Sequence, residues 1–198
     1  MATEAPISKR SRRTRTELSR AAHDEVARSG AIDVAAISSA AGVSPATFYA
    51  HFDTHDDALA AALDLSLSAV IRVSNELFRI ENLLERGVES VVEEMMREVV
   101  AAFGVEAFVM RVALARLPHH RGIRAVYRHH ETASRDHLAR HIELGQKAGL
   151  LRAGDPAHRT TSLLVLTQGL NNPLLLGRPP SPAVIDDLCR SALAVLLP

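Results

Sequence analysis

The segment over residues 33–53 restricts the possible folds of this chain most, because it predicts two short helices joined by one tight turn. Asp33 is a good N-cap for the first helix, and Gly42 supplies the turn that follows it. Ser44 and Pro45 then open the second helix with an N-cap residue followed by proline at the first helical position. This pattern is typical of a helix-turn-helix, whose second helix enters the major groove of DNA.

The composition and the spacing of apolar residues predict helices in the rest of the chain as well. Hydrophobic residues make up 47% of the 198 residues but aromatic residues only 4%, whereas a β sandwich would need more aromatic and β-branched side chains. Caps and apolar stripes predict about nine helices, at residues 14–29, 34–41, 45–52, 54–79, 84–102, 104–117, 121–148, 156–176 and 182–197. We therefore expect an all-α fold, with a small unit of three or four helices followed by a larger bundle.

Charge is distributed unevenly along a chain whose net charge is zero. Residues 1–20 carry six basic and two acidic side chains, a net charge of +4 that the remaining residues balance. A basic flexible arm over residues 1–13, on a mildly acidic body, is a pattern seen in DNA-binding proteins. Its candidate phosphate contacts are Arg12, Arg13 and the neighbouring Arg15. A solvated tail or a localisation signal would show the same charges, so this pattern alone leaves those alternatives open.

The second helix of the predicted pair has an apolar side and a polar side. Phe48 and Phe52, four residues apart, are expected to anchor it to the core. The other side offers hydroxyls, methyl groups, a phenol and an imidazole, which suit contacts to phosphates, base edges and thymine methyl groups. These candidate DNA contacts are Ser44, Pro45, Ala46, Thr47, Tyr49, Ala50 and His51.

Residues 35–63, AAISSAAGVSPATFYAHFDTHDDALAAAL, closely resemble the DNA-binding signature of the TetR (tetracycline-repressor) family. The matching elements are Ile37, Ala41-Gly42-Val43-Ser44, Phe48-Tyr49, His51-Phe52 and Leu59. The resemblance implies that the Ser, Thr, Tyr and His side chains of this segment contact phosphates or bases of a double-stranded DNA operator. It also implies a homodimer, with a DNA-binding domain over residues 14–60 and a helical ligand-binding and dimerisation domain over residues 61–198.

The chain departs from the family pattern in its charges and in one loop. His55 stands where the family usually has a lysine that meets the DNA backbone, and the loop after Gly30 is about two residues short and lacks the usual aromatic residue. No Lys or Arg occurs from Ser29 to Ile71, while five Asp do. We therefore expect the cationic phosphate contacts to come mainly from the arm, helped by hydroxyls and by backbone amides at helix N-termini. His55 remains a candidate DNA contact.

Polar residues on the later helices are candidates for a ligand site. The resemblance places a mainly apolar cavity among the helices at 84–102, 104–117, 121–148 and 156–176, suited to an uncharged or weakly anionic organic molecule. Its candidate polar contacts are Arg111, Tyr127, His130, His137, Gln168 and Asn171. His130, His137 and His141 share one helical face, but no cysteine or carboxylate is fixed beside them by spacing, so we expect no metal and no cofactor.

Two functions fit these patterns, and enzyme activity fits poorly. The first is a transcriptional repressor that a small-molecule ligand releases from a palindromic operator. The second is a ligand-independent regulator that acts by occupancy or with a protein partner; a cavity would favour the first. We find no phosphate-binding glycine loop, nucleophile elbow or zinc-protease pattern in the sequence. We therefore expect that this protein is not an enzyme. With no signal peptide and no apolar run of roughly 18 residues, we expect a cytoplasmic protein without membrane contact.

Overall fold

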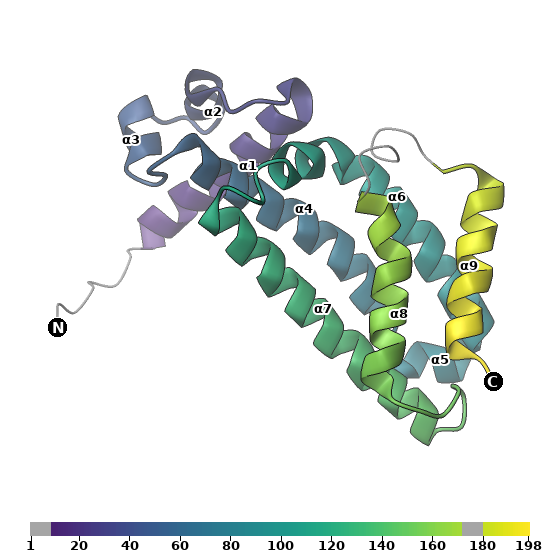
Figure 1. Cartoon of the computed structure of the whole chain (residues 1–198). Coiled ribbons are helices and arrows are strands. Elements are labelled where there is room, and N and C mark those ends of the chain that lie inside the picture. Colours follow the sequence, from purple (N-terminus) through teal and green to yellow (C-terminus); the bar gives the residue numbers. More distant parts are fainter. Residues whose placement is uncertain (1–8, 172–179) are drawn as a thin grey trace.

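A computed structural model describes residues 9–171 and 180–198, and this part of the chain is all-α, as predicted (Figure 1). Within it lie nine α-helices: α1 (Lys9–Ser29), α2 (Val34–Ala40), α3 (Pro45–Tyr49), α4 (His55–Leu77), α5 (Ile80–Arg86), α6 (Val88–Leu114), α7 (Arg121–Lys147), α8 (Pro156–Gln168) and α9 (Pro182–Leu196). A 3₁₀ turn, Gly169–Asn171, extends α8. Of the described helices, none is long and apolar enough to cross a membrane.

The predicted helix starts of the N-terminal region are confirmed by their caps. The Asp33 carboxylate accepts hydrogen bonds from two backbone N–H groups of α2, and the Ser44 hydroxyl accepts one from Thr47 at the start of α3. Thr54 and Asp57 form a reciprocal capping box at the start of α4. These side chains satisfy amide groups that a short helix would otherwise leave unpaired, so local sequence is sufficient to set these boundaries.

Three of the predicted helix boundaries differ clearly from the structure. The first helix begins at Lys9, so residues 9–13 of the expected flexible arm are helical. The separate helices predicted at 84–102 and 104–117 form one helix, α6, which continues through Gly104. Glycine costs a helix only about 1 kcal/mol, and the two halves of α6 bury Val99 and Met110 in the same body. The helix predicted to begin at residue 84 instead begins at Val88, and Leu84 lies exposed on the separate helix α5.

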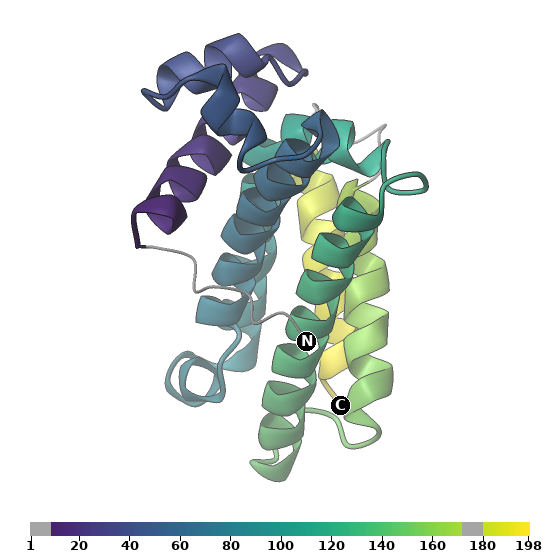
Figure 2. The ribbon, with the colours of Figure 1, turned by 90° about the vertical axis from the view of Figure 1, so that its left-hand side faces the viewer.

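Helix α4 joins a small N-terminal unit to the larger body. A cluster including Leu18, Ile37, Phe48 and Phe52 forms the core of the unit made by α1, α2, α3 and the first turn of α4. The rest of α4 packs against α6 and α7 (Figure 1). Figure 2 shows the unit at one end of the molecule, with α8 and α9 side by side in the body. The predicted domain boundary at residue 60 therefore falls inside a continuous helix.

Candidate DNA-binding surface and interior cavity

The short helix α3 is fixed to its unit by two aromatic rings. Phe48 and Phe52 are fully buried, and their ring centroids lie 5.3 Å apart. Around them, Ser44, Pro45, Ala46, Tyr49 and Ala50 are exposed, while Thr47 and His51 are half-buried. The structure thus places these predicted contacts on α3 and the residues that flank it, at the surface of the N-terminal unit.

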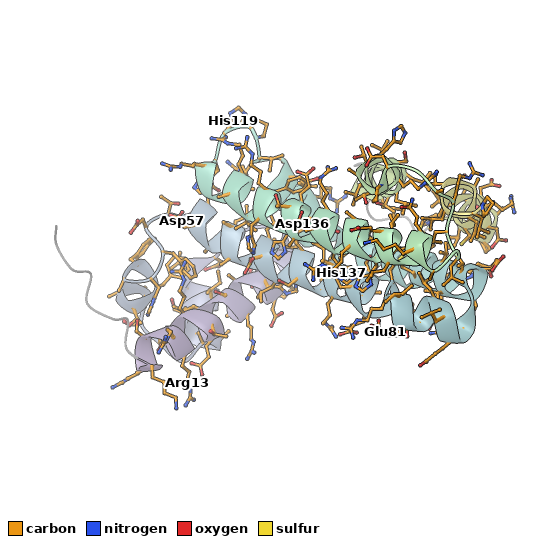
Figure 3. All side chains as sticks on the ribbon, turned by 90° about the horizontal axis from the view of Figure 1, so that it is seen from below. Arg13, Asp57, Glu81, His119, Asp136 and His137 are labelled. Carbon is orange, nitrogen blue, oxygen red and sulfur yellow. The ribbon has the colours of Figure 1, made fainter. Side chains whose placement is uncertain are left out.

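Arg15 performs an internal role that the sequence did not indicate. Its guanidinium donates a hydrogen bond to the backbone carbonyl of His51 and lies over the Phe52 ring, 4.7 Å from the centroid. Both contacts fix the end of α3 on α1. Arg12 and Arg13 are exposed on the first turns of α1, and Arg13 Nε donates to Glu17 Oε1 at 2.8 Å. Figure 3 shows Arg13 at the N-terminal end of the molecule, in the unit that carries α3.

The polar groups around α3 are also close to each other. The hydroxyl oxygens of Ser44 and Thr47 lie 3.0 Å apart, and Tyr49 Oη lies 3.5 Å from His55 Nε2. His55 is the exposed first residue of α4. The surface therefore combines hydroxyls, a phenol and an imidazole, groups that donate hydrogen bonds to phosphates and to base edges.

The helical body contains a cavity of about 120 Å³ between α4, α6, α7 and α8. Its walls are mainly apolar, with Leu67 and Val70 from α4, Met96 and Val99 from α6 and Leu163 from α8. The polar part of the wall comes mostly from one face of α7, which contributes Tyr127, His130, Glu131 and Ser134. A mainly apolar interior with a few polar groups on one side is the usual form of a small-molecule site.

The structure brings together two of the six predicted ligand contacts. Tyr127 and His130 line the cavity. Arg111 instead lies over the Phe108 ring, and His137 Nε2 lies 3.1 Å from the Phe78 carbonyl oxygen, so neither belongs to the wall. The side chains of Gln168 and Asn171 lie outside the described residues.

Sequence reasoning missed Glu131 and Ser134 of the cavity wall. They follow Tyr127 by four and seven residues, which places all three on one face of a helix. This spacing was available in the sequence. Following the face of Tyr127 and His130 along the helix, rather than the histidines alone, would have identified both residues.

The ionisable side chains His130 and Glu131 of the cavity wall both have partners outside it. His130 Nε2 lies 2.7 Å from Asp64 Oδ1 of α4. Glu131 accepts a hydrogen bond from Arg135 at 3.2 Å, and Arg135 also donates to the Thr161 hydroxyl at 2.9 Å. Burial raises the pKa of the Tyr127 phenol, which therefore stays protonated and able to donate a hydrogen bond.

His137 and His141 hold the start of α5 rather than a ligand. His141 Nδ1 accepts a hydrogen bond from the Ile80 N–H at 3.1 Å, and the two imidazole centroids are 4.5 Å apart. Burial lowers the pKa of both side chains, which favours the neutral imidazoles. Figure 3 shows His137 toward the edge of the body where Glu81 of α5 lies. Within residues 9–171 and 180–198, no cluster of three or more His, Cys, Asp or Glu is arranged to hold a metal.

A polar network joins the N-terminal unit to the body. Glu106 of α6, almost fully buried, lies with Oε2 2.8 Å from His23 Nε2 of α1 and accepts a hydrogen bond from the Ser66 hydroxyl of α4 at 2.6 Å. The hydrogen bond with His23 lowers the pKa of Glu106, and the same bond raises the pKa of His23. The network therefore favours an ion pair where α1, α4 and α6 meet.

Comparison with solved structures identifies the fold. A TetR-family transcriptional regulator from Mesorhizobium loti is 19% identical, with a TM-score of 0.75 over 95% of each chain. One from Haloarcula marismortui is 20% identical, with a TM-score of 0.70 over 93% of this chain and 96% of its own. A transcriptional regulator from Saccharomonospora viridis in complex with choline is 21% identical, with a TM-score of 0.64 over 92% and 95%.

The part of the chain that the structure describes is thus all-helical, with an N-terminal helix-turn-helix unit and a helical body. Its fold is that of the TetR-family transcriptional regulators. No protein-family model matches the sequence. No curated protein matches it either.

Proposed function

We propose that this chain is a DNA-binding transcriptional regulator that acts as a homodimer and is released from its operator by a small molecule. The observation that carries the DNA-binding part is the exposed polar face of α3, held by the buried rings of Phe48 and Phe52 and by Arg15. A rigid helix that presents Thr47 and Tyr49 suits insertion into a major groove. Arg12 and Arg13, on the first turns of α1, would supply contacts to backbone phosphates.

The proposed dimer would form through α8 and α9. Both helices carry apolar side chains at their surface, including Val165, which is 63% exposed, and Val184, which is 44% exposed. Leu164, Leu166 and Leu188 are only partly buried beside them. Two copies of this face would form an isologous four-helix interface of roughly 1,200 Å² or more. A monomeric mass in solution at micromolar concentration would contradict this part of the proposal.

The cavity supports release by a ligand over regulation by occupancy alone. Helix α4 lines the cavity with Leu67 and Val70, and its first turn packs with Ala58 in the core of the N-terminal unit. A ligand that binds more tightly to one position of α4 would shift the spacing of the two α3 helices in the dimer. The choline-bound regulator from Saccharomonospora viridis shows that a protein of this fold accommodates a small molecule.

The test is selection of bound fragments from genomic DNA with the purified protein, followed by binding to the enriched sequence. Thr47→Ala and Tyr49→Ala should each weaken specific binding by about 1–3 kcal/mol without loss of folding. Thr132→Ala, an exposed position on α7, is the matched control and should bind as the wild type does. Failure to enrich any fragment would refute the proposal. Enrichment with unchanged affinity in both α3 variants would show that α3 is not the reading helix.

A further inference from the structure

The size of the cavity limits what it can hold. Its volume is about 120 Å³, and Leu67, Val70 and Val99 give it apolar walls. An engineered protein cavity of about 150 Å³ with similar walls binds benzene. A ligand the size of about one six-membered ring therefore fits this cavity without displacing its walls.

The charges of the wall disfavour an ionic ligand. The imidazole of His130 is paired with Asp64, and the carboxylate of Glu131 is paired with Arg135. These groups of the wall therefore already have partners. An ion entering this mainly apolar space would lose part of its hydration and compete with these partners for a counterion, which is unfavourable.

Two polar groups of the wall have no hydrogen-bond partner among the described residues, the Ser134 hydroxyl and the Tyr127 phenol. Ser134 is the more buried of the two, with only 8% of its surface exposed. A hydroxyl in a mainly apolar cavity gains a hydrogen bond when a polar group of a ligand meets it. Tyr127 lies two helical turns away on the same face, and its phenol is protonated because burial raises its pKa.

We infer that the cavity binds a small, uncharged, mainly apolar molecule of about one ring, whose single hydroxyl exchanges a hydrogen bond with Ser134. The inference rests on the proposed function, because it names the chemical class of the releasing ligand. The ring lies against the apolar side chains of α4, α6 and α8, and the hydroxyl lies against α7. This orientation matches the polar face of the ligand to the polar wall of the cavity.

Calorimetric titration of the full-length protein, without DNA, tests this class with four probes of similar size. Phenol carries the ring and the hydroxyl, toluene the ring alone, benzoate a negative charge and choline a positive charge. We expect phenol to bind about tenfold more tightly than toluene, which is the worth of one net hydrogen bond. Benzoate and choline should bind more weakly than phenol. Toluene binding as tightly as phenol, tighter binding of either ion, or no binding of any probe at millimolar concentration would overturn the inference.

Ser134→Ala identifies the partner of the hydroxyl. It should remove the preference for phenol over toluene and leave toluene affinity unchanged, because only the hydrogen bond is lost. Ser191→Ala, an exposed position on α9, is the matched control and should keep the preference. Urea unfolding of both variants establishes that each is folded. An unchanged preference in Ser134→Ala would overturn the assignment of this residue.

The class of ligand and the proposed regulation can fail separately. Phenol binding with the expected preference, but without effect on DNA affinity, supports the ligand class and refutes release by this ligand. A ligand with equal affinity for both conformations shifts no equilibrium. Conversely, DNA binding that persists while no probe enters the cavity overturns the ligand class and leaves the helix-turn-helix function intact.

Discussion

The N-terminal unit and the helical body are stabilised in different ways. Helices α2 and α3 are only seven and five residues long, and side-chain caps from Asp33 and Ser44 set their starts. Helix α6, with 27 residues, has no side-chain cap hydrogen bond and continues through Gly104. Short helices are marginal on their own and depend on caps, whereas a long helix depends on the surface it buries. The short helices of the N-terminal unit therefore depend on local sequence, whereas the long helices of the body depend on the surface that they bury.

The loss of one ring should break the unit and spare the body. Phe48→Ala removes a fully buried side chain from the core around α3 and should destabilise the unit by about 3–5 kcal/mol. The chain has two tyrosines, Tyr49 in the unit and Tyr127 in the body, so each region carries one fluorescent reporter. Urea unfolding of Phe48→Ala should give an early transition at Tyr49 and a later one at Tyr127.

Variants with a single tyrosine separate these two signals. The Tyr127→Phe variant keeps only Tyr49, which reports on the N-terminal unit. The Tyr49→Phe variant keeps only Tyr127, which reports on the body. If both reporters shifted together in the Phe48→Ala background, the two regions would unfold as one. The comparison between a locally specified unit and a separately packed body would then be wrong.

The junction between the regions should depend on pH. The raised pKa of His23 gives stabilisation that is present below its ordinary value of 6.5 and is lost as pH rises through the folded value. The lowered pKa of Glu106 gives stabilisation present above 4.5 and lost as pH falls through the folded value. The pair therefore contributes most between about pH 5 and pH 6.5.

Replacing His23 measures this contribution. His23→Gln should cost about 1–2 kcal/mol of unfolding free energy at pH 6 and clearly less at pH 8.5, by urea denaturation. His119→Gln, at an exposed position before α7, serves as the control and should change stability little at either pH. Figure 3 shows His119 at the outer edge of the molecule. An equal cost of His23→Gln at both pH values would mean that the network contributes through packing alone.

Loss of a cap should affect the unit by a smaller amount. Ser44→Ala removes the hydroxyl that accepts the Thr47 N–H, which should cost about 1 kcal/mol of stability. The same variant should weaken DNA binding, because α3 starts at this residue. Ser44→Asp, which keeps an acceptor at the N-cap, should restore the stability but not the DNA affinity, since its charge repels phosphates. Full stability in Ser44→Ala would show that packing of Phe48 suffices to form α3.

The smallest expected effect is a gain of affinity at His55. This residue is exposed at the start of α4, beside Tyr49, in a region without Lys or Arg. His55→Lys should tighten DNA binding severalfold at pH 8 and steepen the salt dependence by roughly one ion, because it adds one phosphate contact. His158→Lys, at an exposed position on α8, adds the same charge away from α3 and controls for net charge. Equal gains in both variants would show that His55 does not face the DNA.

The sequence alone determined the local features of this protein. The caps at Asp33 and Ser44 and the apolar pair of Phe48 and Phe52 predicted the helix-turn-helix correctly, and the composition and apolar stripes predicted the all-α fold. These signals act between residues at most a few positions apart, so a pattern in the chain contains them in full. The face of α7 that carries Tyr127 and Ser134 was equally readable, because helical periodicity alone aligns its members.

Only the tertiary structure decided how distant residues meet. Arg15 contacts the carbonyl of a residue 36 positions away, and Glu106 meets Ser66 and His23 across 40 and 83 positions. No pattern within one helix carries such pairings, because they depend on the angles at which whole helices cross. Tertiary packing also decided that α6 passes through Gly104, since burial of its two halves in one body outweighs the local cost of glycine. The same packing left the cavity between α4, α6, α7 and α8, because the volumes of side chains from four separate segments fix its size.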